Sequence, residues 1–430
     1  MKLELGVSRE IITPKLGGYF LGYGSKKVSD SVHDDLTVTA ITFSYGKLRS
    51  MLVSVCLCLV NNELSDKIRF ECGKAAGVPA SNVILSCTHT HSGPYTESFD
   101  GFPLDEEYIN NILMPRSISA AKNSSLNMKS VKMGVASIDS RIGINRRQIL
   151  SNNEVILGNN PWGPYDPELT VLSFKDDTDK TIANIVHVGA HCTAAGVITE
   201  VTRDWAGYMV DRLEAESGGV TAFVNGALGD VAPRMANGGS VGDLKLTAEL
   251  GGFAGAEAVR AYKDIRVYLD EDMSVALGEI CIPNDPLMSR ECVNKMLNEY
   301  KAVPGFDSHR FIPGRIKKLE AVLHLHDNGE KGEDEFKFDQ VLIRIGPVVF
   351  IPIPFEVSTD ISMRLRELSK YGYTLILSCS NGSNSYLPTE DQICRGGYEI
   401  ESFHWSRIRR LPNNTDWHMV SQNIDLMEKL

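Results

Sequence analysis

Short apolar runs alternate with amphipathic stretches along the chain, beginning in its first quarter. Residues 36–45 and 49–60 are rich in β-branched and aliphatic residues and flank the turn-forming pair Gly46-Lys47, which predicts a two-stranded hairpin. Apolar side chains recur at helical spacing over 63–76 and predict a helix that ends at the following glycine. The apolar run Val83–Cys87 then predicts a buried strand. A strand, a helix and a strand in this order favour parallel pairing and the α/β class.

The same patterns recur in the rest of the chain. They predict further helices over 105–124, 204–216, 243–264 and 356–368, and further strands over 6–13, 131–138, 166–174, 181–188, 220–224, 274–282, 340–345, 348–353 and 375–378. The expected fold is therefore α/β, with a large mixed β-sheet core flanked by helices. Because the sequence shows no internal repeat and no linker of biased composition, we expect residues 1–430 to form a single domain.

Composition and charge narrow the classes of function. The 430 residues are 43% hydrophobic and 23% charged, which is typical of a soluble globular protein. A net charge of −11 argues against nucleic acid and anionic membranes as partners, since both need basic surfaces. No apolar run is long enough for a transmembrane segment. The start lacks a hydrophobic signal region, so we expect a cytoplasmic protein, or a secreted one if a signal has been removed.

The nine cysteines show no zinc-ribbon spacing. Cys56 and Cys58 lie two apart in the predicted strand 49–60, where both face the core. We therefore expect buried free thiols, as in a reducing compartment, and no thiolate metal site.

Residues with ligand chemistry follow several of the predicted buried strands. His89 and His91 follow the first of these, and His191, Glu356 and Tyr386 each come after a later one. Open α/β sheets bind their ligands beyond the carboxyl ends of such strands. Catalytic zinc takes nitrogen and oxygen ligands from three or more residues and leaves a position for water, whose pKa it lowers to about 7. Two histidines, a glutamate and a weaker tyrosinate or water fit this chemistry, so the sequence predicts a Zn²⁺ site.

Each of these residues also has a simpler interpretation. A His-x-His pair in a loop can be satisfied by backbone hydrogen bonds, and Tyr386 can be an ordinary loop residue. Glu356 can be an acid in the first turn of a helix, where the helix dipole favours it. A second His-x-His pair, His324 and His326, lies in an exposed amphipathic segment and is a weaker metal candidate.

Several segments together resemble one known family. They are Thr88–Pro94 (Thr-His-Thr-His-Ser-Gly-Pro), Ala190–Thr193, Arg203–Tyr208, Asn225–Val231, Pro354–Glu356 and Tyr386–Thr389, with further likeness at 6–14 and 166–169. In residue identity and in order, these segments resemble the N-terminal catalytic domain of the neutral/alkaline (non-lysosomal) ceramidases, and the resemblance extends over most of the chain. The resemblance implies the fold of that catalytic domain and a zinc-dependent amidase, which hydrolyses the N-acyl bond of ceramide to a fatty acid and sphingosine.

The resemblance also implies roles for individual residues. The expected metal ligands are His89, His191, Glu356 and Tyr386, and the expected catalytic residues are His91, Arg146, Asp204 and Tyr398. His91 would polarise the carbonyl or carry a proton, and Arg146 would contact the reacting carbonyl. Asp204 or Asp230 would orient a ligand imidazole, their simpler interpretations being a helix cap and a turn residue. Tyr398 would line the substrate pocket, or simply pack.

Two departures from the family pattern bear on the substrate. Ala232 stands where the family carries a serine, so a serine-assisted step is absent. The chain also ends soon after Tyr398, without the family's additional C-terminal β domain. We therefore predict that a metal-bound water attacks an amide or related carbonyl bond of a small or amphiphilic molecule, rather than of ceramide in particular. The alternatives are a metal-dependent phosphoester or lactone hydrolase and a non-catalytic binding protein, and an oligomer is left open.

Overall fold

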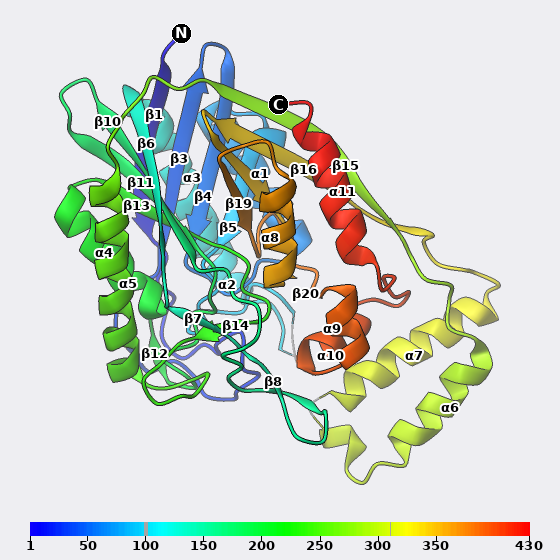
Figure 1. Ribbon diagram of the computed structural model, residues 1–430. Coiled ribbons are helices and arrows are strands. Elements are labelled where there is room, and N and C mark those ends of the chain that lie inside the picture. Colours follow the sequence, from blue (N-terminus) through cyan, green and yellow to red (C-terminus); the bar gives the residue numbers. More distant parts are fainter. Residues whose placement is uncertain (99–101, 310) are drawn as a thin grey trace.

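Two β-sheets form the centre of the protein (Figure 1), whose computed structural model describes residues 1–98, 102–309 and 311–430. The larger, eight-stranded sheet has the order β13 (Val220–Asn225), β11 (Thr181–Val188), β10 (Glu168–Asp176), β6 (Lys129–Asp139), β1 (Leu3–Ile11), β3 (Thr37–Tyr45), β4 (Leu48–Val55) and β5 (Val83–Cys87). The smaller, four-stranded sheet has the order β15 (Met273–Pro283), β16 (Glu335–Ile345), β17 (Val348–Pro352) and β19 (Tyr373–Leu377).

Both sheets are mixed, and each of their parallel pairs belongs to a strand–helix–strand unit. The helix α1 (Asn62–Ala76) joins β4 to β5, as the sequence predicts. In the same way α4 (Asp204–Ser217) lies between β11 and β13, and α8 (Thr359–Leu368) between β17 and β19. The residues that follow such strands meet where α/β sheets bind ligands.

The two sheets pack face to face, with helices on both outer faces. Leu5, Phe43 and Leu172 of the larger sheet share a buried core with Ile343 and Phe350 of the smaller one. The outer face of the larger sheet is covered by α1, α4, α3 (Met114–Leu126) and α5 (Leu244–Asp264). The outer face of the smaller sheet is covered by α8 and α11 (Thr415–Met427). The predicted α/β class, with a large mixed sheet flanked by helices, is thus confirmed.

Some predicted boundaries are wrong. The strand predicted over 49–60 ends at Val55, so Cys56 and Cys58 follow it, although both thiols are buried as expected. The helix predicted over 356–368 begins only at Thr359. Several helices near the C-terminal end were not predicted, α11 among them. Two others are α6 (Arg290–Lys301) and α7 (Ile312–Asp327), which pack on each other through a small apolar core of their own.

The other elements are short. They are β2 (Ser31–Val32), η1 (Ala80–Asn82), α2 (Glu106–Tyr108), η2 (Ile109–Leu113), β7 (Gly143–Asn145), β8 (Arg147–Ile149), β9 (Val155–Leu157), β12 (Glu200–Val201), β14 (Val231–Pro233), η3 (Phe306–Ser308), β18 (Glu356–Val357), β20 (Tyr386–Leu387), α9 (Glu390–Arg395) and α10 (Tyr398–His404). Among the helices of the described ranges, none combines the length and apolar character needed to cross a membrane.

Candidate metal centre

Three side chains from separate strand–helix–strand units converge beyond the ends of their strands. His89, His191 and Glu356 each offer one ligand atom, and these atoms lie within 4.8 Å of one another. The Oε2 atom of Glu356 lies 3.1 Å from Nε2 of His191 and 3.6 Å from Nε2 of His89. All three side chains are buried. The structure therefore brings together the two histidines and the glutamate that the sequence predicts as metal ligands.

Main-chain pairing places these residues. An isolated parallel bridge between Thr90 and Cys192 holds the segment of His89 against that of His191. Glu356 lies in β18, which pairs in parallel with β20 so that Glu356 stands opposite Tyr386. The interpretation of Glu356 as a first-turn helix acid is therefore wrong, because this residue belongs to a strand that precedes the helix.

The hydrogen bonds of the two imidazoles leave their Nε2 lone pairs facing Glu356. Nδ1 of His89 lies 2.9 Å from the carbonyl oxygen of Cys58. Nδ1 of His191 lies 2.8 Å from the carbonyl oxygen of Leu228 and 3.0 Å from that of Val231. Because a carbonyl only accepts, each Nδ1 carries the proton and each neutral ring presents Nε2 as a lone pair. Backbone carbonyls thus fix the tautomer that a metal ligand needs.

The charge states of the three side chains also suit a cation. Burial, reinforced by the charge of Arg146, lowers the pKa of His191 to about 4, so this imidazole is neutral at pH 7. Burial opposes ionisation of Glu356, but the imidazoles of His89 and His191 and the Arg146 guanidinium outweigh it and lower the pKa of Glu356 to about 2. Within the described part of the chain, Oε2 of Glu356 is buried without a hydrogen-bond partner. Two nitrogen lone pairs and a carboxylate oxygen at this spacing fit a divalent cation such as zinc.

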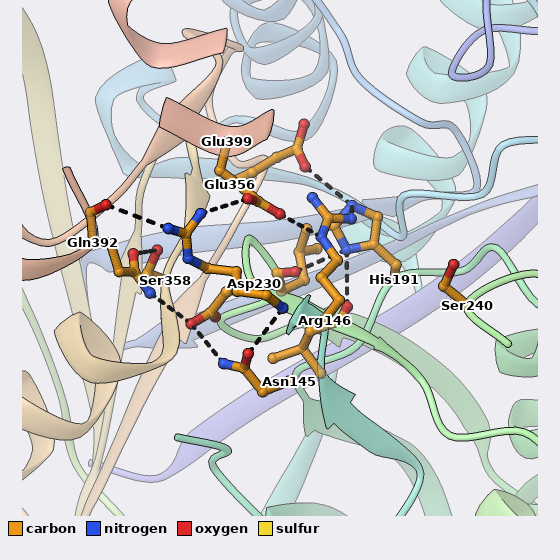
Figure 2. A network of polar contacts seen from close by, with 12 residues as sticks. Asn145, Arg146, His191, Asp230, Ser240, Glu356, Ser358, Gln392 and Glu399 are labelled. Atoms are coloured by element: carbon orange, nitrogen blue, oxygen red, sulfur yellow. Dashed lines mark hydrogen bonds and ion pairs between the residues drawn. The ribbon is translucent and has the colours of Figure 1, made fainter. Parts of the chain in front are cut away.

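Arg146 and two tyrosines lie beside these ligand atoms, and Figure 2 shows Arg146 with His191 and Glu356. Nη1 of Arg146 lies 2.9 Å from Nε2 of His191. Its guanidinium carbon is 5.4 Å from the ring centre of Tyr386 and 6.0 Å from that of Tyr398. Burial and the charge of Glu356 raise the pKa of Tyr386 well above its usual value, so in this setting its hydroxyl is a phenol. Arg146, Tyr386 and Tyr398 are therefore all next to the predicted metal ligands.

His91 lies at the centre but outside the group of three. Its Nε2 atom is 3.2 Å from Nε2 of His89, and the ring of Tyr23 packs against it with centroids 4.8 Å apart. Cys58 forms a second metal-capable group with His89 and His91. Burial raises the pKa of Cys58 well above its usual value, however, and a neutral thiol is a poor ligand. His91 therefore lies next to the group of three, and its role stays a prediction.

The two aspartates hold the backbone around the centre. Asp204 accepts hydrogen bonds from the amides of Ala194 (3.1 Å), Ala195 (2.9 Å) and Trp205 (2.7 Å). Asp230 accepts from the amide and hydroxyl of Thr359, both at 2.9 Å. Because the ligand imidazoles donate to carbonyl oxygens, these carboxylates act on the loops that carry the ligands rather than on the rings.

Other residues singled out in the sequence do not belong to the metal-capable groups of the described residues. Ala232 is buried in β14, opposite Ile144 of β7. His324 and His326 lie on α7 and belong to no metal-capable group among residues 1–98, 102–309 and 311–430. Sequence reasoning also missed Glu399, a buried acid that contacts Arg146, although it lies just after the Gly396-Gly397 turn.

Comparisons with known proteins relate the chain by its fold. No family model matches the sequence, and no curated protein does. A neutral ceramidase from Pseudomonas aeruginosa superposes with a TM-score of 0.76 and 17% sequence identity, over 100% of this chain and 75% of its own. A ceramidase complexed with C2 superposes with a TM-score of 0.73 and 18% identity, over 100% of this chain and 76% of its own. The chain thus has the fold of these ceramidases, as the resemblance in the sequence implies.

Proposed function

We propose that residues 1–430 form one metal-dependent hydrolase domain, which uses Zn²⁺ to cleave the N-acyl amide bond of a small amphiphilic molecule. The observation that carries this proposal is the convergence of His89, His191 and Glu356 at buried, lone-pair-bearing atoms beside Arg146. The ceramidase fold supports the choice of an acyl amide over other bonds. Two nitrogen ligands and one oxygen ligand support zinc over harder or softer ions.

His89, His191 and Glu356 would hold the ion, with Tyr386 as a fourth ligand opposite Glu356 in the β18–β20 pair. A zinc ion there would supply a Lewis acid and a water of lowered pKa. The carbonyls of Cys58 and Leu228 would keep the two imidazoles in the ligating tautomer.

The remaining residues would act on the substrate. Arg146 carries a buried positive charge beside the ligand atoms, so its N–H groups would stabilise the carbonyl oxygen as negative charge develops on it. Burial and the neighbouring imidazoles lower the pKa of His91 well below its usual value, so at pH 7 it is a neutral imidazole with one unprotonated ring nitrogen. This atom would take up a proton and return it to the leaving amine. Tyr398 would line the substrate side of Arg146, and Asp204 would hold the loop after His191.

The test combines metal analysis with an assay panel. Metal-free protein is titrated with zinc and assayed on fluorogenic N-acyl amides of short and long acyl chain, a phosphoester and a lactone. We expect one zinc per chain, fastest turnover of an amide, and loss of both zinc and activity in the single variants His89→Ala, His191→Ala and Glu356→Ala. His324→Ala is the matched control, because this histidine is exposed on α7.

Three results would overturn the proposal. Stoichiometric zinc that survives all three substitutions would rule out this site. Faster turnover of the phosphoester or the lactone would point to another hydrolase class. Zinc-loaded protein that retains an N-acyl amide tightly without turnover would be a binding protein on the same fold.

A further inference from the structure

Two consecutive arginines beside the candidate metal centre share one buried carboxylate. Oε1 of Glu399 accepts a hydrogen bond of 2.8 Å from Nε of Arg146, and Oε2 accepts one of 2.7 Å from Nη1 of Arg147. Glu399 is 1% exposed, Arg146 7% and Arg147 6%. Figure 2 shows Arg146 with His191 and Glu399 close by. Burying three charged groups is costly, so a contact of this kind needs an explanation.

A bend in the backbone lets both arginines reach the same carboxylate. Successive side chains of a straight strand point to opposite faces. Here Arg146 separates β7 from β8, its amide donates to the carbonyl of Asp230 (2.8 Å), and the amide of Arg147 donates to Oδ1 of Asn145 (3.0 Å). The strand is therefore interrupted at Arg146, and two neighbouring guanidinium groups turn towards Glu399.

Arg147 fixes the carboxylate in place. Its Nη2 donates to the carbonyl of Gly396 (2.6 Å) as well as to that of Gln392 (3.3 Å), so it ties the end of α9 to the start of α10. Gly397 makes this approach feasible, because it has a φ of +102° and a Cβ there would lie only 3.2 Å from Nη1 of Arg147. Glu399 is thus held by one arginine and presents its other oxygen to Arg146.

Glu399 and the two arginines that it contacts form a clamp, and this clamp sets the direction in which Arg146 donates its hydrogen bonds. A guanidinium is planar and rigid, so fixing its Nε–H group also fixes where its Nη groups point. With Nε held by Glu399, Nη1 of Arg146 lies 2.9 Å from Nε2 of His191. Arg147, by contrast, donates its side-chain hydrogen bonds to Glu399 and to backbone carbonyls.

We infer that Glu399 is a positioning residue, which aims the Arg146 guanidinium at the reacting carbonyl while Arg147 holds Glu399 in place. This role rests on the proposed function only in its effect on turnover, because the clamp itself is a property of the fold.

A mutant cycle with a spectroscopic readout tests the inference. The variants are Glu399→Gln, Glu399→Asp, Arg146→Ala and the double variant Glu399→Gln/Arg146→Ala. Glu401→Gln is the matched control, because Glu401 lies on the same helix and also pairs with an arginine, Arg315 at 2.8 Å, but is 54% exposed. For each protein we measure zinc content and kcat and KM on an N-acyl amide, and for each protein that retains Arg146 we also measure the ¹H–¹⁵N signal of its Nε–H group.

We expect Glu399→Gln to lower kcat about 100-fold, the loss typical of a group displaced by about 1 Å, with zinc content and KM nearly unchanged. Glu399→Asp should recover part of that loss, and it keeps the measurement available if Glu399→Gln folds poorly. In the Arg146→Ala background Glu399→Gln should cost little more, because both changes remove the same interaction. Glu401→Gln should match the wild type.

Independent losses in the double variant, or an equal loss in Glu401→Gln, would overturn the positioning role. If the zinc-loaded wild type hydrolyses no amide, the proposed function fails, and the Nε–H signal still decides the clamp. That signal should shift and exchange faster with water in Glu399→Gln, and an unchanged signal would refute the inference.

Discussion

A glycine in the loop that follows β1 leaves just enough room for His91, and filling that room tests the role of the imidazole. A Cβ atom at Gly22 would lie 2.5 Å from Cγ and 2.9 Å from Cε1 of His91, and closer still to Nδ1. Gly22 also has a φ of +129°, a conformation that side chains rarely adopt. Gly22→Ala therefore strains the backbone and pushes on His91 at the same time.

The size of the effect follows from these distances. Apolar contacts settle at about 3.5 Å, so the Cβ and the ring must separate by about 1 Å. Tyr23, the residue after Gly22, holds the loop in place. Its ring packs on His91, and the Tyr23 hydroxyl donates to the carbonyl of Thr193 (3.3 Å). The ring must therefore give way, and a displacement of about 1 Å costs about 100-fold in kcat. The backbone strain and the crowding should each lower the free energy of unfolding by about 1–3 kcal/mol.

Gly17→Ala in the same loop is the matched control. Gly17 has a φ of +97° with nothing within 4 Å of a Cβ, so this variant carries the backbone strain without the contact. We measure kcat, zinc content and urea unfolding for both variants. Gly22→Ala should lose turnover and keep its zinc, whereas Gly17→Ala should lose only stability. Equal turnover in the two variants would refute a catalytic role for His91, and loss of zinc from Gly22→Ala alone would make His91 a ligand.

Three further predictions concern the metal and the buried acids. Glu356→Gln should weaken zinc binding by more than the roughly 10–100-fold seen for residues that only support a ligand, measured by competition with a chelating dye. Burial raises the pKa of Asp204 from 3.8 to about 6, so the folded state binds its proton more tightly and stability falls by about 3 kcal/mol as the pH rises from 4 to 6. Asp204→Asn should abolish that part of the pH dependence, and an unchanged slope would contradict it. Removal of zinc with EDTA should lower Tm, and free zinc at about 1,000 times its Kd should restore about 4 kcal/mol, whereas a Tm insensitive to EDTA would argue against a metal in the fold.

The strands that carry the candidate ligands could be predicted because they are buried on both faces. Such strands appear as short uninterrupted apolar runs, and the run Val83–Cys87 corresponds residue for residue to β5. A polar residue soon after such a run is easily noticed. His89 comes soon after the run Val83–Cys87, and His191 comes soon after the strand Thr181–Val188. The sequence therefore indicated both histidines and the α/β class without knowledge of the contacts between strands.

Glu356 and Glu399 show what local patterns do not contain. Glu356 precedes an amphipathic helix, so helical periodicity extended to it, but its conformation is set by a two-residue strand that pairs with Tyr386, far along the chain. Pairing over two residues leaves no periodicity in a sequence. Glu399 is an acid in the first turn of a short helix, and such acids are commonly exposed. Only the bend at Arg146 turns this position into a buried contact.

Main-chain pairing holds together the segments that carry the candidate metal ligands. The bridge between Thr90 and Cys192 and the pair of Glu356 with Tyr386 are made by backbone groups, which a side-chain substitution does not remove. The ligand atoms are therefore positioned independently of most surrounding side chains. This explains how the chain shares its fold with the Pseudomonas aeruginosa ceramidase at a TM-score of 0.76 while only 17% of residues are identical. For the proposed hydrolase it also follows that replacing a side chain such as that of Ala232, which is buried in β14, should change which acyl amide is cleaved before it changes how the metal is held.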